Sequence, residues 1–530
     1  MLKTVAQSLL DLLQKNGVKN IYGVTGDTIF PLFDVLSEYD QLKFIGTIHE
    51  TSAAFMASYQ AKLTGEIGIC VATSGPGIAN LTNGLADAYF DQAPVLAITG
   101  QVSQNKIGTK AKQYLNQQTL LKSITYSSEM VASTETLIPI VSEAIEKALS
   151  KKTVTHVSIP EDLFGQQINK NIPILDNRNY VKKVSGFSGQ FEEAVSLLQE
   201  ANQPLIIIGV KDKQLKEYLE NLAERTGAAI IISQQAKGII PDKHSRVIGG
   251  IGEAYVPAII EDVDLILQIG SASYEKKFLP EGKKTIQIVK NQGNIDYDRA
   301  EVIIKGDVMN ILKELLENIN PAVNEQWEEK IGSEKEQLNN LINEEYNRST
   351  VTPGYLMTVL SEKVAEDAII VCDIGAFTHW FDTYFQASRQ TILLSSNWRS
   401  MGSALPGAIS ASLSNDNEKQ VIVLTGDGGL LVSLNELATA VKYQLPVTII
   451  VANNNIYEIE KLKMENKNFK PFGIDMRVPD FAELAKSFGA QGLISEEPEK
   501  PGLLIEESLN IDKPVVLDVK VEEAQLPFIQ

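Results

Sequence analysis

Short apolar runs alternate with longer segments of mixed character along most of the chain. In the first third, the runs IYGVT, KFIGTI and GICVAT are separated by helix-like segments such as ETSAAFMASYQAKLTG. Apolar runs of this length predict strands that are buried on both faces, and the segments between them predict helices. Strands that alternate with helices are typical of parallel sheets. We therefore expect an α/β fold of doubly wound parallel sheets.

Two polar stretches interrupt this alternation. Residues 165–186 contain a proline and several asparagines and are predicted to be a linker. Residues 320–350 are rich in charged side chains and are predicted to form a solvated helix that leads to a connector. The chain has 530 residues, and a domain has about 150 residues. We therefore expect three α/β domains, over residues 1–165, 187–320 and 352–530.

The composition limits the kinds of partner and the cellular location that we expect for the protein. There are 48 Lys and Arg residues against 67 Asp and Glu, which gives a formal charge of −19. This acidic balance argues against nucleic acid as a main partner, because phosphate backbones are bound by Lys and Arg. No apolar run approaches the roughly 20 residues of a membrane-spanning helix, and the first residues do not resemble a signal peptide. We expect a soluble, cytoplasmic protein.

The clearest chemical motif is GDGG at residues 426–429, followed by two asparagines at 453–454, with 24 residues between GDG and NN. Each part follows a predicted strand, so both are expected at the carboxyl ends of parallel strands, where open α/β sheets bind ligands. The glycines let the backbone approach a phosphate, and Asp427 and Asn454 offer oxygen ligands suited to Mg²⁺. A Gly-Asp-Gly turn by itself is usually structural, but both motifs at this spacing predict a magnesium and phosphate site.

With these motifs, the chain resembles the pyruvate oxidase and acetohydroxyacid synthase family of thiamine diphosphate enzymes across essentially its whole length. The resemblance implies that the first domain binds the pyrimidine ring of the cofactor, that the central domain is FAD-binding-like, and that the last domain binds the diphosphate. It also implies that Mg²⁺ is held by Asp427, Asn454 and the carbonyl of Ile456. The further cofactor contacts that it implies in the last domain are Gly375, Ala376, Gly426, Gly428, Gly429 and Tyr457.

Two more residues match family positions that act on the cofactor. Glu50, in HETSAAF, matches the glutamate whose carboxyl binds the pyrimidine ring and thereby promotes removal of the proton from the reactive carbon. Met401, in RSMGSALPGAI, matches the bulky apolar residue that holds the cofactor bent. Without the resemblance, Glu50 would be interpreted as an acid in the first turn of a helix and Met401 as a core side chain.

Members of the family differ in the fate of the fragment that remains once a 2-oxo acid has lost CO₂. Oxidases pass electrons from it to FAD, synthases add it to a second oxo acid, and plain decarboxylases protonate it. Segments such as SMGSALPGAISASL resemble bacterial pyruvate oxidases, so we expect conversion of pyruvate to CO₂ and acetate or acetyl phosphate. The alternatives are an acetolactate synthase-like carboligase, a non-oxidative decarboxylase and, more remotely, a thiamine diphosphate-binding protein without catalysis.

The chain departs from the family near the expected substrate and flavin sites. Where members usually have Phe-Gln-Glu, it has Lys112, Gln113 and Tyr114. Gln113 is the expected catalytic contact to the substrate, and Lys112 is a candidate partner for a carboxylate or phosphate. At residues 289–291, Val-Lys-Asn replaces the acidic residues that are common near FAD, which leaves FAD binding open. Glu460 is expected beside the substrate if the segment after NN faces the pocket, the alternative being a solvated helix.

In this family, the glutamate and the diphosphate site come from different subunits. The resemblance therefore implies a homodimer or homotetramer with shared active sites, acting on a small 2-oxo acid. No lipid-binding tail is expected after the last apolar run, PVVLDVKV.

Overall fold

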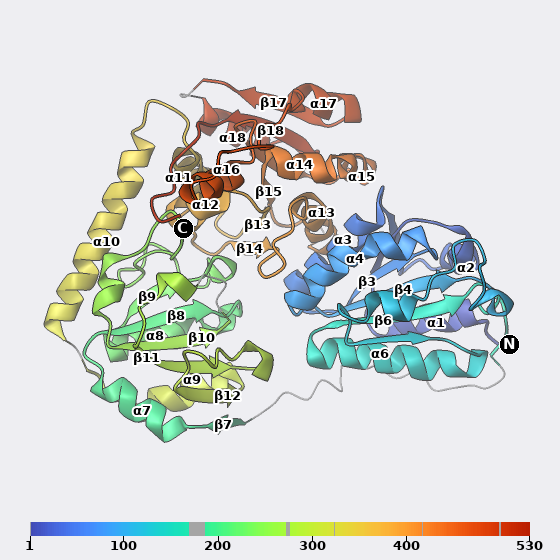
Figure 1. The fold of residues 1–530 in the computed structure, drawn as a ribbon, viewed down its shortest axis with the longest axis horizontal. Helices are drawn as coiled ribbons and strands as arrows, with labels where there is room; N and C mark the ends of the chain where they lie inside the picture. Colours follow the sequence, from blue (N-terminus) through green and yellow to red (C-terminus); the bar gives the residue numbers. More distant parts are fainter. Residues whose placement is uncertain are drawn as a thin grey trace.

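The computed structural model describes residues 2–168, 186–271, 276–322, 324–415, 417–497 and 500–529. The strands of these residues form three six-stranded sheets, which lie in the blue, green and orange-to-red parts of Figure 1. Almost all strand pairs are parallel, and helices pack against each sheet. The predicted fold of three α/β domains with parallel sheets is confirmed. The predicted linker lies almost wholly outside the described residues.

The first sheet has the strand order β2-β1-β3-β4-β6-β5, and its pairs are parallel. Its strands β3 (Gly68–Ala72), β4 (Val95–Gln101) and β6 (Val154–Pro160) are buried throughout, which explains the apolar runs in β3 and at the start of β4. The other elements of this domain are β1 (Asn20–Gly23), β2 (Lys43–Gly46), β5 (Ser127–Met130), α1 (Val5–Lys15), α2 (Phe30–Leu36), α3 (Glu50–Thr64), α4 (Pro76–Phe90), α5 (Gln117–Leu121) and α6 (Leu137–Lys151).

The central sheet has the order β7-β12-β11-β10-β8-β9, and its edge strand β7 runs antiparallel to β12. This antiparallel edge was not predicted, because β7 has only three residues. It lies so close to β12 that a Cβ at Gly189 would be 2.1 Å from the carbonyl oxygen of Ile303. The elements are β7 (Phe187–Gly189), α7 (Phe191–Glu200), β8 (Pro204–Gly209), α8 (Lys216–Thr226), β9 (Ala229–Ile232), β10 (Leu265–Gly270), β11 (Lys284–Val289), β12 (Val302–Gly306) and α9 (Val308–Asn318).

The third sheet has the order β14-β13-β15-β16-β18-β17, which repeats the strand order of the first sheet. All of its pairs are parallel. Its elements are α11 (Pro353–Lys363), β13 (Ile369–Cys372), α12 (Phe377–Tyr384), β14 (Thr391–Leu394), α13 (Ala404–Ser414), β15 (Val421–Gly426), α14 (Asp427–Ser433), α15 (Leu437–Lys442), β16 (Val447–Asn453), α16 (Glu458–Asn466), α17 (Phe481–Phe488), β17 (Gln491–Ser495), α18 (Pro501–Leu509) and β18 (Val515–Lys520).

The charged stretch before the third domain forms the long helix α10 (Glu325–Tyr346), which runs beside the central and third domains in Figure 1. It is a helix, as predicted, but it is not solvated all round. Trp327, Ile331 and Leu338 are buried and lie at helical spacing, so one face packs against the protein. Among the described helices, none is long and apolar enough to cross a membrane.

A buried ion triad joins the first domain to the third. The ammonium of Lys62 on α3 lies 2.7 Å from a carboxylate oxygen of Asp87 and 2.7 Å from one of Asp91. Burial alone would lower the pKa of Lys62, but the two carboxylates hold that pKa above its ordinary value. Asp91 also accepts hydrogen bonds from the backbone N–H groups of Ser396 and Asn397, at 2.9 and 2.8 Å. The triad thereby fixes the segment after β14 against the end of α4.

The contact between the central and third domains is also polar. Lys237 and Asp242 form a buried ion pair of 2.7 Å, and Lys237 donates to the carbonyl of Asp382 on α12. The carboxylate of Asp382 packs directly on Gly250, where a Cβ would be 2.2 Å from its oxygen. One of its two oxygens has no hydrogen-bond partner within the described chain. Burial raises the pKa of Asp382 to about 7, although the charge of Lys237 opposes this shift.

We expect Asp382→Asn to flatten the pH dependence of folding stability. An aspartate in an unfolded chain has a pKa of about 3.9, so from about pH 4 to pH 7 the folded protein binds more protons at Asp382 than the unfolded protein does. The unfolding free energy therefore falls as the pH rises through this range, by on the order of 4 kcal/mol. Asparagine has the same shape without the charge, so the variant should be the more stable protein near pH 8.

Thermal unfolding of both proteins near pH 4.5 and pH 8 checks this expectation. The gain in melting temperature from Asp382→Asn should be confined to the higher pH. Parallel pH profiles for the two proteins would contradict the raised pKa of Asp382.

Candidate active site

A pocket lies at the carboxyl ends of strands β13, β15 and β16. Open parallel sheets bind ligands at this edge, because strand ends and helix starts converge there. The residues that line the pocket include every cofactor contact predicted in the last domain, namely Gly375, Ala376, Met401, Gly426, Asp427, Gly428, Gly429, Asn454, Ile456 and Tyr457.

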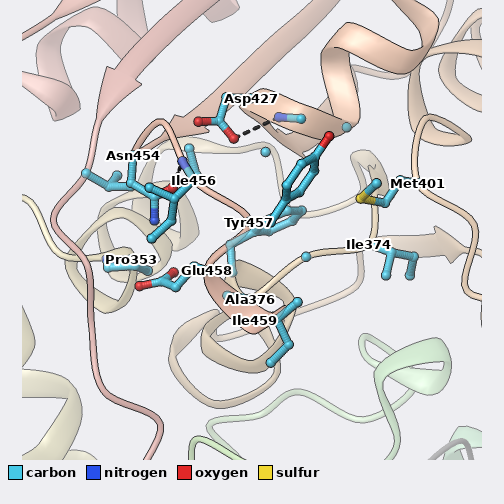
Figure 2. Close-up of a pocket in the computed structure, with 17 residues that line it drawn as sticks. Pro353, Ile374, Ala376, Met401, Asp427, Asn454, Ile456, Tyr457, Glu458 and Ile459 are labelled. Carbon is cyan, nitrogen blue, oxygen red and sulfur yellow. Dashed lines mark hydrogen bonds between the residues drawn. The ribbon is translucent and has the colours of Figure 1, made fainter. Parts of the chain in front are cut away.

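Three oxygen donors gather at one side of the pocket. Figure 2 shows Asp427, Asn454 and Ile456 near one another, with the ring of Tyr457 between Asp427 and Met401. The carboxylate of Asp427 accepts hydrogen bonds from the N–H groups of Gly428 (2.7 Å) and Asn455 (2.6 Å). Burial raises the pKa of Asp427 above its ordinary value. This carboxylate is therefore buried and is held by backbone N–H groups.

The GDGG motif needs glycine because its backbone is tightly packed. A Cβ at Gly428 would lie 2.8 Å from the ring of Tyr457 and 3.2 Å from the sulfur of Met476. A Cβ at Gly429 would lie 2.6 Å from a carboxylate oxygen of Asp373. Neither glycine has a positive φ, so crowding and not turn conformation excludes a side chain at both positions.

Met401 lies on the opposite side of the pocket from the oxygen donors (Figure 2). It belongs to residues 395–403, which connect β14 to α13 and are here called the Met401 loop. Next to it, the N–H of Gly402 donates to both carboxylate oxygens of Asp373, at 2.9 and 3.0 Å. Burial raises the pKa of Asp373 to about 6, against the effect of these hydrogen bonds. The methionine is therefore held from one side by a carboxylate at the end of β13.

All three domains match those of one enzyme family. The N-terminal thiamine pyrophosphate binding domain matches residues 3–120, the central domain matches residues 191–315, and the C-terminal thiamine pyrophosphate binding domain matches residues 373–519. The chain belongs to the thiamine pyrophosphate enzyme family. The residues that line the pocket all lie within this C-terminal match except two. Pro353 precedes the match in the chain, and Val521 follows it.

Relatives of the same family align over nearly the whole chain. A putative thiamine pyrophosphate-containing protein, YdaP, of Bacillus subtilis is 33% identical over 99% of this chain and 93% of its own length. A probable acetolactate synthase large subunit of Methanocaldococcus jannaschii is 30% identical over 99% of this chain and 93% of its own length. An acetolactate synthase of Bacillus subtilis is 28% identical over 98% of this chain and 93% of its own length.

The pocket fits magnesium and thiamine diphosphate, the cofactor of this family. A hard divalent cation accepts carboxylate, amide and carbonyl oxygens together with phosphate oxygens, and Asp427, Asn454 and Ile456 offer one oxygen of each protein type. Within the described chain, no group of three or more His, Cys, Asp or Glu residues could hold a metal. The thioether of Met401, opposite the oxygen donors, suits contact with an aromatic ring.

Glu50 and Gln113 lie together, but outside this pocket. Both border the glycine turn between β3 and α4. A Cβ at Gly75 would be 2.9 Å from the Cβ of Gln113, and one at Gly77 would be 3.4 Å from a carboxylate oxygen of Glu50. The other oxygen of Glu50 accepts a hydrogen bond of 2.9 Å from the side-chain amide of Asn80. Gln113 has a φ of +63°, a left-handed conformation that is uncommon for a residue with a side chain.

The two candidate substrate residues lie at the surface of the single chain. Lys112 and Glu460 are both exposed, and neither is among the residues that line the pocket. The helix that follows Asn453 and Asn454 has some residues in the pocket and others at the surface. Glu458 and Ile459 line the pocket, whereas Lys461 pairs with Glu523.

Glu458 is a pocket residue that the sequence pattern does not single out. It is buried and accepts a hydrogen bond of 2.8 Å from the N–H of Ala524. Desolvation raises the pKa of Glu458 to about 7. A segment with acids at 458, 460 and 465 does not reveal which of them turns inward. Only the direction of the chain after Asn454 decides this.

The crevice at the carboxyl ends of the central sheet is lined mostly by polar side chains. Its lining includes the carboxylates of Asp91, Asp296 and Asp298, and no lysine or arginine among the residues described there. Gln92 of the first domain crosses its edge and bonds to Asn291 and Asn294. The carboxylate of Asp91 is paired with Lys62 here, and FAD binding stays a prediction of the sequence that this lining does not test.

We expect Gly428→Ala to weaken the binding of thiamine diphosphate and Mg²⁺ roughly tenfold or more, since an added methyl group in a packed site forces its neighbours to move. Titration calorimetry with thiamine diphosphate in the presence of Mg²⁺ measures the change. Gly332→Ala is the matched control, because that glycine lies in α10 with no atom near its Cβ position. The control should bind the cofactor like the parent protein. Equal affinities for all three proteins would show that Gly428 does not border the cofactor.

Proposed function

We propose that the protein is a magnesium- and thiamine diphosphate-dependent enzyme that removes the carboxylate group of a small 2-oxo acid such as pyruvate. The observation that carries this proposal is the pocket of the third domain, where three kinds of oxygen donor face a thioether across the space between them. When bound, the cofactor supplies the carbon that adds to the substrate carbonyl and the electron sink for the pair released with CO₂.

Residues of this chain bind the cation, the cofactor and the substrate. Asp427, Asn454 and the carbonyl of Ile456 hold the cation, and the glycines of the GDGG motif leave room for the diphosphate. Glu50 holds a proton against the pyrimidine ring. Gln113, which borders the same glycine turn as Glu50, binds the polar end of the substrate.

Two copies of the chain complete each site in this proposal. Every residue that lines the pocket lies between 353 and 521, whereas Glu50 and Gln113 lie in the first domain. Apolar side chains are exposed beside both halves: Ile48 is 55% exposed just before Glu50, and Val432 is 57% exposed just after the GDGG motif. Exposed apolar surface of this kind marks regions that become buried on association. Glu50 of one chain would then face Asp427 of another.

We further propose that the fragment left after decarboxylation is added to a second 2-oxo acid, as in acetolactate synthases. One observation favours this over the oxidase that segments of the sequence resemble. The relatives that carry a named activity are acetolactate synthases.

We expect the purified protein, supplied with Mg²⁺ and thiamine diphosphate, to convert two pyruvate molecules into acetolactate and CO₂ without an electron acceptor. Colorimetric detection of acetoin after acid treatment, together with CO₂ release, measures the product. Asp427→Asn is the control that should abolish it. Acetate or acetyl phosphate that forms only with an added acceptor would instead identify an oxidase, and acetaldehyde would identify a plain decarboxylase.

We expect Glu50→Gln and Asp427→Asn to be nearly inactive separately but to complement each other when their subunits are exchanged. A dimer with one chain of each kind has one site with both changes and one site with neither. Random exchange makes half of the dimers mixed, so activity should recover to roughly a quarter of the parent value. A mixture that stays inactive, although both variants are folded and exchange subunits, would contradict the shared site.

A further inference from the structure

Helix α4 touches both halves of the proposed catalytic machinery, one turn apart. Near its start, the side-chain amide of Asn80 donates to Glu50 at 2.9 Å, and the carbonyl of Asn80 accepts from the hydroxyl of Thr51 at 2.6 Å. Gly77, also on α4, lies beside the other oxygen of Glu50, which would be 3.4 Å from a Cβ at that position. The start of α4 therefore holds the glutamate at the start of α3 in place.

The next turn of α4 holds the Met401 loop of the third domain. Asn83 donates to the hydroxyl of Ser400 at 3.0 Å and accepts from the indole N–H of Trp398 at 2.7 Å. At the end of the helix, the ring of Phe90 stacks on the ring of Trp398, with centroids 5.0 Å apart and an angle of 14° between the planes. Together with the bonds of Asp91 to this loop, these contacts fix the residues on one side of Met401.

We propose that α4 is a positioning element for two different active sites, in which Asn80 orients Glu50 for one site and Asn83 orients Met401 for the other. The inference rests on the proposed shared sites, since Glu50 and Met401 of one chain then face different cofactors. Asn80 and Asn83 are three residues apart on one rigid helix. The two side chains therefore lie less than one helical turn apart.

The two asparagines differ in the chemistry that they must supply, and this difference separates a positioning role from a merely structural one. Asn80 must donate, because its partner is a carboxylate. An aspartate at position 80 would place a second carboxylate at hydrogen-bond distance from Glu50, where like charges repel. Asn83 mainly accepts, from an indole N–H that can donate only. An aspartate there keeps this bond, and the hydroxyl of Ser400 can turn to donate to it.

The same substitution at the two positions should therefore have opposite results. We expect Asn80→Asp to slow hydrogen–deuterium exchange at the reactive carbon of bound thiamine diphosphate roughly tenfold or more, and Asn83→Asp to leave it within about threefold of the parent value. Exchange proceeds near pH 8, is stopped with acid and is measured by NMR. Cofactor affinity and melting temperature are also measured on each variant. Asn80→Ala and Asn83→Ala remove both side-chain amides and provide the comparison. Equal effects of aspartate at the two positions would overturn the assigned roles.

Mixed dimers with one intact site test whether the two residues serve different sites. In a dimer of an Asp427→Asn chain and a Glu50→Gln chain, the first chain supplies the working glutamate and the second supplies the working Met401 loop. We expect Asn80→Ala to slow exchange more in the first chain than in the second, by roughly tenfold or more, and Asn83→Ala to show the reverse order. Equal losses in both chains would overturn the division between sites. Absence of complementation in the unmodified mixed dimer would contradict the shared site itself, so the two failures are distinguishable.

Discussion

The arrangement of the first and third domains depends on a lysine buried between two aspartates. A charged ammonium away from water is stable only when opposite charges and hydrogen bonds surround it. Lys62 meets this condition through Asp87, Asp91 and the carbonyl of Leu394 in the third domain. Because Asp91 simultaneously accepts the N–H groups of residues 396 and 397, the charges of the first domain determine the course of the loop that carries Met401. Loss of any member would leave a buried charge without its partner, so the contact permits little adjustment.

The site itself follows from a second constraint, the geometry of parallel strands. The carboxyl ends of β13, β15 and β16 meet at one edge of the third sheet, and each contributes the residues directly after it to one pocket. Crowding at this edge requires glycine at positions 428 and 429. Burial raises the pKa of Asp427 there, which a divalent cation would reverse by supplying the missing positive charge.

The first and third domains have the same strand order but different chemistry at their glycine turns. In the first domain, the turn between β3 and α4 holds Glu50 and Gln113. In the third, the turn after β15 holds Asp427 and the oxygen donors beside it. The proposed dimer joins one turn of each kind in every site. The central domain repeats the parallel architecture, and Gln92 of the first domain is joined to it by hydrogen bonds with Asn291 and Asn294.

The sequence by itself predicted the parallel α/β class and the residues of the diphosphate pocket. Buried central strands must be continuously apolar, and the glycines and oxygen donors that come after them are adjacent to those strands in the chain. It did not predict the short edge strands such as β5 and β7, because their few residues are only partly apolar and lack a recognisable period. Nor could it show that Glu458 turns into the pocket while Glu460 faces solvent, that Asn80 holds Glu50, or that Asp91 holds the Met401 loop. These contacts join residues that are distant in the chain or differ by a fraction of a helical turn. They were decided only when packing fixed the domains against one another, since local sequence patterns report which face of an element is apolar and not which neighbour covers it.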